Sequence, residues 1–233
     1  MKVKEFCDTL VSIATSYKTI YATGCFGWRM TEQNKQRALK SYKQNETKRH
    51  DLIMNSDKET FAFDCICLIK GVLWGWCGDM SHTYGGAKYC SNGVPDCTED
   101  AMINSCKDVS TDFTNIVAGE MVYMKGHCGV YIGNGEVVEA TSKWDCKVQI
   151  TKLGNIKGCT GDKVRVWEKH GKLPYIEYPV AVTPPTVKRK TNKEIAIEVI
   201  KGLWGNGSVR KRKLTEAGYD AHEVQKLVNQ ILA

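Results

Sequence analysis

Residues 119–141, GEMVYMKGHCGVYIGNGEVVEAT, limit the possible folds of this chain more than any other segment. Apolar and polar residues alternate along it, and Val, Tyr and Ile are frequent, which is typical of β-strands. Gly133, Asn134 and Gly135 interrupt the alternation and tolerate the positive φ angles of a tight hairpin turn. The segment therefore predicts two antiparallel strands.

Helices are predicted before this hairpin. The N-terminal segment carries apolar residues at helical spacing, namely Phe6, Leu10, Ile13 and Tyr17. Glu5 and Asp8 interrupt the apolar run that a signal peptide needs, so we expect a helix of the folded protein and no export signal. We expect the front half to be helical and a further strand near Trp167. Helices followed by an antiparallel sheet predict an α+β fold.

A basic, proline-containing segment divides the chain. Residues 180–191 contain two prolines and the run Lys188-Arg189-Lys190 without periodicity, which predicts an extended linker between domains 1–179 and 192–233. The second domain shows three short helical patterns, which predict a small three-helix bundle. Ser208 and Asp220 are its expected N-caps. The last helix has an apolar face, expected from Val224, Leu227, Val228 and Ile231.

The charge distribution limits the partners. The net charge is +7, and most of the excess lies in the linker and the tail, which suits an anionic partner. The tail has aromatic residues only at Trp204 and Tyr219, so we expect no nucleic-acid partner. No apolar run approaches the roughly 18 residues of a membrane span, so we expect no membrane partner.

The chain contains 11 cysteines, an odd number without repeated spacing, which favours mostly reduced thiols over a disulfide framework. Structural zinc is a minor alternative, since Cys90, Cys97 and Cys106 lie further apart than the cysteines of a zinc knuckle. We expect no metal and no organic cofactor.

Residues 61–76, FAFDCICLIKGVLWGW, hold two thiols in a nearly uncharged run. A cysteine in the first turn of a helix gains from the N-terminal N–H groups, which favour a thiolate, and Cys65 has this position. The Cys67 side chain points about 200° around the helix from Cys65 and is expected to serve packing. Most buried cysteines belong to the core, so position in the helix is not enough to identify a nucleophile. A catalytic cysteine also needs a base that takes its proton.

His127 is the expected base. It begins the first strand of the predicted hairpin and is flanked by Gly126 and Gly129, which leave room beside the ring. Strand pairing returns Glu139, twelve residues later, to the start of that strand, where it can accept a hydrogen bond from the ring. The pattern predicts Cys65 as nucleophile, His127 as base and Glu139 as the group that orients it. Asp145 is the next candidate for the third role.

These segments resemble the NlpC/P60 family, papain-like cysteine peptidases that hydrolyse peptidoglycan. Residues 63–68, FDCICL, are similar to the family's Phe-Asp-Cys-Ser-Gly-Leu. Residues 126–135 match Gly-His-Val-Gly-Ile-Tyr-Ile-Gly-Asn-Gly except at Cys128 and Val130. The resemblance implies the same triad, with Tyr21 and Asp64 in substrate binding. Glu139 is a departure, because the family usually has His, Asn or Gln there. Further departures are long insertions near 28–60 and 79–112.

Residues 194–232 are similar to a CW_7 repeat, the cell-wall-binding unit of certain phage lysins. They contain the pattern Gly-x-Trp-Gly-Asn-Gly, followed later by Ala-Gly-Tyr-Asp. The resemblance implies a helical unit that binds the glycan-peptide repeat of peptidoglycan. Trp204 and Tyr219 could stack on a sugar while Arg210 holds a carboxylate. The alternative is that Trp204 and Tyr219 form the core of a very small domain.

Together these features predict a phage endolysin that hydrolyses an amide bond in the peptide stem of peptidoglycan, for example between γ-D-Glu and a diamino acid. An N-acetylmuramoyl-L-alanine amidase with the same triad is one alternative, and a wall-binding virion or structural protein with a silent thiol is another. Anionic wall polymers are possible further partners. Self-association would strengthen binding by a single repeat. The expected location is the cytoplasm of the infected host until the membrane is permeabilised.

Overall fold

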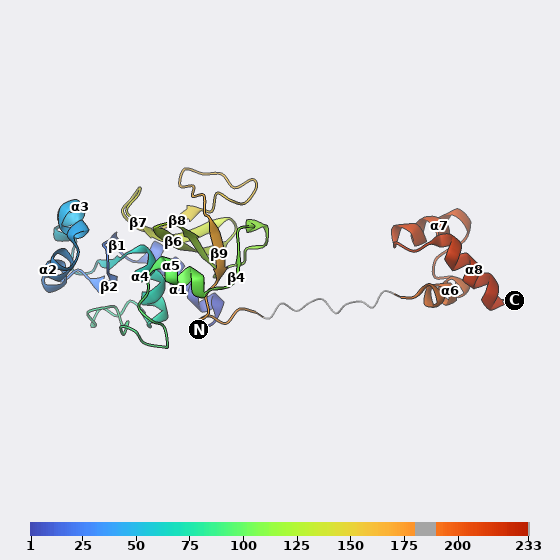
Figure 1. Cartoon of the computed structure of the whole chain (residues 1–233), viewed down its shortest axis with the longest axis horizontal. Coiled ribbons are helices and arrows are strands. Elements are labelled where there is room, and N and C mark those ends of the chain that lie inside the picture. The colour runs from blue at the N-terminus through green and yellow to red at the C-terminus, as the bar shows by residue number, and fades with distance from the viewer. Residues whose placement is uncertain (180–189, 233) are drawn as a thin grey trace. The chain divides into compact units, whose positions relative to one another are not determined.

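The computed structural model describes residues 1–179 and 190–232 (Figure 1). The chain forms two compact units, residues 1–179 and 180–233. Of the predicted linker, only Lys190 and Thr191 lie within the described residues. No described helix has both the length and the apolar character needed to cross a membrane.

The first unit mixes helices and antiparallel sheet, so the α+β prediction is confirmed. Its helices are α1 (Val3–Ser16), α2 (Glu32–Ser41), α3 (Lys43–Met54), α4 (Cys65–Leu73), α5 (Glu99–Ser105) and the 3-10 turn η1 (Phe113–Asn115). Its strands are β1 (Thr19–Tyr21), β2 (Phe26–Arg29), β3 (Phe61–Phe63), β4 (Lys107–Ser110), β5 (Met121–Met124), β6 (His127–Gly133), β7 (Glu136–Thr141), β8 (Lys147–Lys152) and β9 (Lys169–Lys172).

A six-stranded antiparallel sheet, in the order β4-β9-β5-β6-β7-β8, carries the predicted hairpin as β6 and β7. Asn134 and Gly135 have φ angles of 53° and 72°, which explains their place in the turn. The strand expected near Trp167 begins only at Lys169. Gly126 has a φ of 78° in the tight turn before β6, so turn geometry and not space beside His127 explains this glycine.

The prediction of a wholly helical front half is wrong. A three-stranded sheet, in the order β1-β3-β2, lies there, with β1 parallel to β3. Its strands have only three or four residues, too few for alternation to be recognised. All three residues of β3 are buried, which removes the alternation altogether. The short strand β3 leads directly into α4 and fixes where that helix begins.

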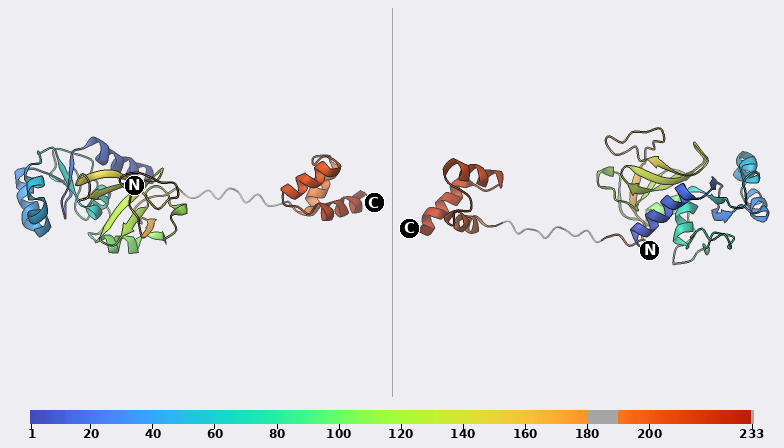
Figure 2. Two further views of the ribbon diagram at one scale, coloured as in Figure 1. Left: turned by 90° about the horizontal axis from the view of Figure 1, so that it is seen from above. Right: turned by 180° about the vertical axis from the view of Figure 1, so that it is seen from behind.

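Helix α4 lies in the centre of the first unit. All nine of its residues are buried, and it contacts β2, β6 and β7 (Figure 2). Helix α1 buries Phe6, Leu10 and Ile13, as predicted, and Tyr17 follows its last turn. Because α4 packs against the strands that carry His127 and Glu139, the start of the helix and the start of β6 are brought together.

The second unit contains α6 (Asn192–Ile200), α7 (Gly207–Glu216) and α8 (Ala221–Leu232). These helices share a core formed by Ile195, Ala196, Val199, Leu214, Val224 and Val228. The Ser208 cap is wrong, because α7 begins at Gly207 after Asn206. Asp220 does accept hydrogen bonds from the first N–H groups of α8. Ile231 is exposed, so it lies outside the predicted apolar face.

Candidate active site

Cys65 is the first residue of α4, and Asp64 caps this helix. Asp64 Oδ1 accepts the Cys67 N–H at 2.7 Å, and Oδ2 accepts the Gly24 N–H at 2.6 Å. Burial raises the pKa of Asp64 to about 6, and the charge of Cys65 adds to this increase. Both Asp64 oxygens therefore accept backbone N–H groups and hold the nucleophile turn, and the Asp64 side chain also borders a cleft beside α4.

His127 faces both Cys65 and Glu139. Its Nε2 lies 2.5 Å from Glu139 Oε2, which leaves Nδ1 for the Cys65 thiol. Burial alone would lower the pKa of His127, but hydrogen bonds to Cys65 and Glu139 raise it to about 9. A ring with this pKa is protonated at neutral pH and can form an ion pair with a thiolate.

The pKa of the Cys65 thiol lies well below its ordinary value. A hydrogen bond from the Cys128 thiol lowers it most, against the opposing effect of burial, and His127 lowers it further. Cys128 follows His127 on β6 and is fully buried, and its own pKa is raised by burial and by Cys65. The residue that departs from the family pattern therefore favours the thiolate of the nucleophile, which sequence reasoning did not anticipate.

Glu139 is completely buried and is held by more than His127. Thr151 Oγ1 donates to its Oε1 at 2.6 Å, and Arg165 donates through Nε at 3.1 Å and through a terminal nitrogen at 3.0 Å to Oε2. Burial by itself would raise the pKa of Glu139, but His127 and Arg165 lower it below the ordinary range. Glu139 is therefore an ionised, doubly anchored acceptor for the imidazolium.

Arg165 is the main residue of this site that sequence reasoning missed. It lies 26 residues after Glu139, in a segment without regular structure, and its guanidinium stacks 4.5 Å from the Trp144 ring centroid. The only available signal was indirect, since a buried carboxylate in a triad requires a positive partner. Trp167 is a second residue of the site that sequence reasoning missed. Its ring stacks on the His127 ring, with 5.6 Å between the ring centroids and an interplanar angle of 16°.

Tyr21 lies at the end of β1, opposite Phe63 in the parallel pair with β3. Burial raises the pKa of its phenol, and the neighbouring charges of Cys65 and Asp64 raise it further. The Arg49 guanidinium lies 4.7 Å above its ring. Tyr21 is therefore close enough to Cys65 and Asp64 for their charges to raise its pKa, and its hydroxyl is neutral at neutral pH. Asp145, in contrast, is paired with Lys163 and Lys147 away from His127.

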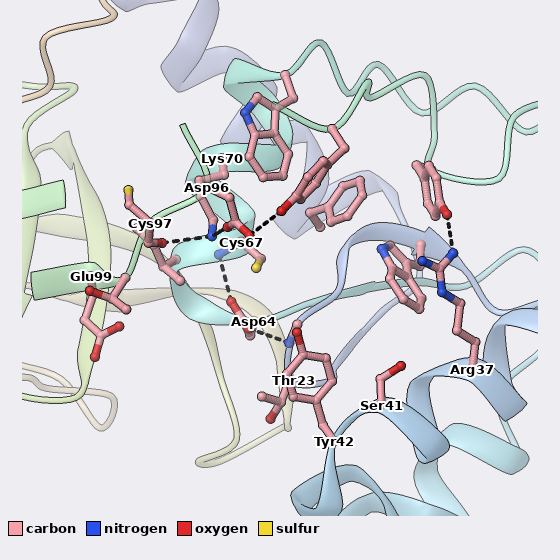
Figure 3. Close-up of a pocket in the computed structure, with 18 residues that line it drawn as sticks. Thr23, Arg37, Ser41, Tyr42, Asp64, Cys67, Lys70, Asp96, Cys97 and Glu99 are labelled. Carbon is pink, nitrogen blue, oxygen red and sulfur yellow. Dashed lines mark hydrogen bonds and ion pairs between the residues drawn. The ribbon is translucent and has the colours of Figure 1, made fainter. Parts of the chain in front are cut away.

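Cys67 lies on the other side of the α4 helix start. It is buried, and burial raises its pKa well above the ordinary value, so it stays a neutral thiol. It borders a cleft of about 640 Å³ that is also lined by Asp64 and Ile66 (Figure 3). Neither Cys65, His127 nor Glu139 lines this cleft, although Cys65 lies between two residues that do.

All eleven cysteines lie in the described residues, and all are free thiols. Cys90 is exposed while Cys97 and Cys106 are half-buried, and they do not gather into a metal site. Across residues 1–179 and 190–232, no group of three or more His, Cys, Asp or Glu side chains is placed to hold a metal ion.

The three predicted binding residues of the second unit have partners within that unit. Trp204 packs edge-on against Tyr219 at 6.0 Å, and its Nε1 donates to Glu198. Arg210 donates to the Gly205 carbonyl, to Asn206 and to Gln225. Both aromatic residues pack against the apolar core. Only Arg210 borders the cavity of about 250 Å³ between α7 and α8.

Comparison with known proteins concerns this second unit. Residues 193–232 match the CW_7 repeat. A stretch of 42 residues is 54% identical to a lysozyme of Streptococcus phage Cp-7. The match covers 18% of this chain and 12% of the phage protein, so the chain spans only a small part of that relative. The repeat shows a wall-binding type of module, and the first unit carries the candidate chemistry.

Proposed function

We propose that the protein is a phage endolysin of the cysteine peptidase type, which hydrolyses an amide bond in the peptide stem of peptidoglycan. The observation that carries this proposal is the convergence of Cys65, His127 and Glu139 at the start of a buried helix. The CW_7 repeat and the partial match to a phage lysozyme support a lytic enzyme that acts on the cell wall. The resemblance of the first unit to NlpC/P60 hydrolases supports the reaction class and a papain-like fold.

The geometry suggests a definite sequence of steps. The Cys65 thiolate attacks the carbonyl carbon of the scissile amide, and the C–N bond breaks while His127 gives its proton to the leaving nitrogen. The stem is then held as a thioester on Cys65. Neutral His127 takes a proton from water, the hydroxyl oxygen attacks the thioester carbonyl, and the Cys65 thiolate leaves. Glu139 stabilises the imidazolium in each protonated state.

The oxyanion of both tetrahedral intermediates requires hydrogen-bond donors. The backbone N–H of Cys65 belongs to the first turn of α4, where N–H groups have no partner inside the helix. Tyr21, which is neutral at neutral pH and whose pKa the charge of Cys65 raises, is a second donor in this proposal. Peptidoglycan is the partner of both units, and the enzyme reaches it from the host cytoplasm once the membrane is permeabilised.

Digestion of purified cell walls tests this proposal. Mass spectrometry of the released fragments identifies the new termini, and a new α-amino group within the stem together with an intact muramic acid linkage is the expected result. Release of whole stems from muramic acid would indicate the amidase. Walls that remain intact while the protein sediments with them would indicate a binding protein with a silent thiol and would contradict the proposal.

A further inference from the structure

The cleft beside α4 is built largely by the two insertions that depart from the family pattern. Helix α2 supplies Arg37 and Ser41 on one side, and the segment between α4 and α5 supplies Tyr84, Tyr89 and Asp96 (Figure 3). The N-terminal turn of α4 borders it as well. Asp64 and Ile66, the chain neighbours of Cys65, line the cleft, so the cleft borders the turn that carries the nucleophile although Cys65 itself does not line it.

Most charged groups of the cleft have partners within the protein. Lys70 is buried, pairs with Asp96 and donates to the Cys97 carbonyl at 2.9 Å. The Asp64 oxygens accept backbone N–H groups. Within residues 1–179 and 190–232, Arg37 has no carboxylate partner and the Glu99 side chain has no hydrogen bond or ion pair. Figure 3 shows Arg37 and Glu99 at opposite ends of the cleft.

Arg37 is held in place without being neutralised. Its guanidinium lies 4.6 Å from the Trp28 ring centroid, and one nitrogen donates to the Tyr84 hydroxyl. The stacked plane keeps further N–H donors available, and a rigid guanidinium fork suits a carboxylate better than a flexible ammonium does. The aromatic wall therefore presents a positive group in a fixed orientation.

We propose that this cleft binds the peptide stem through a free carboxylate on Arg37 and an amino group at Glu99. The inference rests on the proposed function. A glutamate linked through its γ-carboxyl keeps a free α-carboxylate, and a diamino acid carries a second amino group. A polyanionic wall polymer fits less well, because the Glu99 carboxylate at the far end opposes repeated negative charge.

Calorimetry with soluble stem peptides tests the site, in a full-length Cys65→Ala background that prevents turnover. A peptide with a free glutamate α-carboxylate should bind about tenfold to a hundredfold more tightly than its carboxamide analogue. Arg37→Gln should remove this difference while leaving the affinity for the carboxamide unchanged, which also shows that the variant is folded. Lys40→Gln, on the same helix but outside the cleft, is the matched control and should keep the preference.

A second experiment tests whether Glu99 binds the amino group of the diamino acid. Acetylation of the diamino acid should weaken binding to the Cys65→Ala protein, and Glu99→Gln should make the free and acetylated peptides equal. A preference for carboxylate that persists in Arg37→Gln would overturn the proposal, as would displacement of the peptide by glycerol phosphate oligomers. Digestion of walls by the unaltered chain is a separate measurement. If stems are cleaved but Arg37→Gln does not change the carboxylate preference, only the proposed binding cleft is wrong. If Arg37→Gln removes the preference but no stems are cleaved, the proposed reaction is wrong.

Discussion

The two units treat their predicted site residues in opposite ways. In the first, His127 lies between Cys65 and Glu139, and residues distant in sequence hold the group together. In the second, Trp204, Arg210 and Tyr219 contact their own helices and loops. The predicted residues of the first unit therefore gather in one place, whereas those of the second unit pack within that unit. The two units differ in whether the fold leaves a hydrogen-bond donor or a charged group of these residues available to a substrate.

Three arginines show this difference clearly. The donors of Arg210 are shared among a carbonyl, Asn206 and Gln225, and Arg165 is committed to Glu139 and Thr141. Within the part of the chain that the structure describes, the Arg37 guanidinium lies over the Trp28 ring and donates to the Tyr84 hydroxyl, and it forms no ion pair. Arginine in a suggestive sequence pattern is thus weak grounds for a binding site until its partners are known.

The largest expected effect concerns the two thiols of α4. Cys65→Ala should reduce wall hydrolysis by about 10⁴-fold or more, because a triad without its nucleophile keeps only the binding contribution. Cys67→Ser is the matched control and should keep most activity, since Cys67 lies on the other side of the helix start. Turbidity of cell-wall suspensions measures both, with circular dichroism as the check on folding. An inactive, folded Cys67→Ser protein would reverse the assignment.

The next effect concerns the buried Glu139–Arg165 pair. Arg165→Met leaves a buried carboxylate without its cation and should lower the free energy of unfolding by about 3–5 kcal/mol. Combining it with Glu139→Gln removes both charges and should restore most of that stability, measured by urea unfolding at neutral pH. Lys163→Met, which breaks a surface pair with Asp145, should change stability by less than about 1 kcal/mol. A double variant no more stable than Arg165→Met would contradict the pairing.

The pH profile tests the charge state of the triad. The reactive form needs ionised Cys65 and protonated His127, so kcat/KM on soluble fragments should fall as the pH rises past about 9, the pKa of His127. Glu139→Gln removes a negative charge from beside the ring, which lowers the pKa of His127 and should move the alkaline limb to lower pH. An alkaline limb that does not move would show that Glu139 does not stabilise the imidazolium.

The smallest effect is expected in the second unit. Trp204→Ala removes a half-buried ring that packs on Tyr219, and it should lower the stability of that unit by about 1–3 kcal/mol. Trp204→Phe keeps a ring against Tyr219 and should lose less. Thermal unfolding of the full chain and sedimentation with purified walls measure the two properties separately. Loss of wall binding without loss of stability would instead support direct stacking on a sugar.

Local patterns predicted a large part of the fold. The hairpin, its turn and helix α1 follow from periodicity and from residues that tolerate positive φ, which are properties of neighbours in the chain. The short strands β1 to β3 were not predicted, because three or four mostly buried residues show no alternation of apolar and polar residues. The cap at Ser208 was wrong because Asn206, another residue type that favours the N-cap position, stands there two residues earlier.

The sequence by itself placed Cys65 at a helix start and put His127 and Glu139 twelve residues apart on paired strands, because strand pairing and helix geometry are short-range. Only the tertiary structure decided the rest of the site. Arg165 and Trp167 reach it from an irregular segment, and the inserted residues form a cleft with Arg37 left open. These contacts depend on burial and charge compensation between distant segments, which no local pattern encodes.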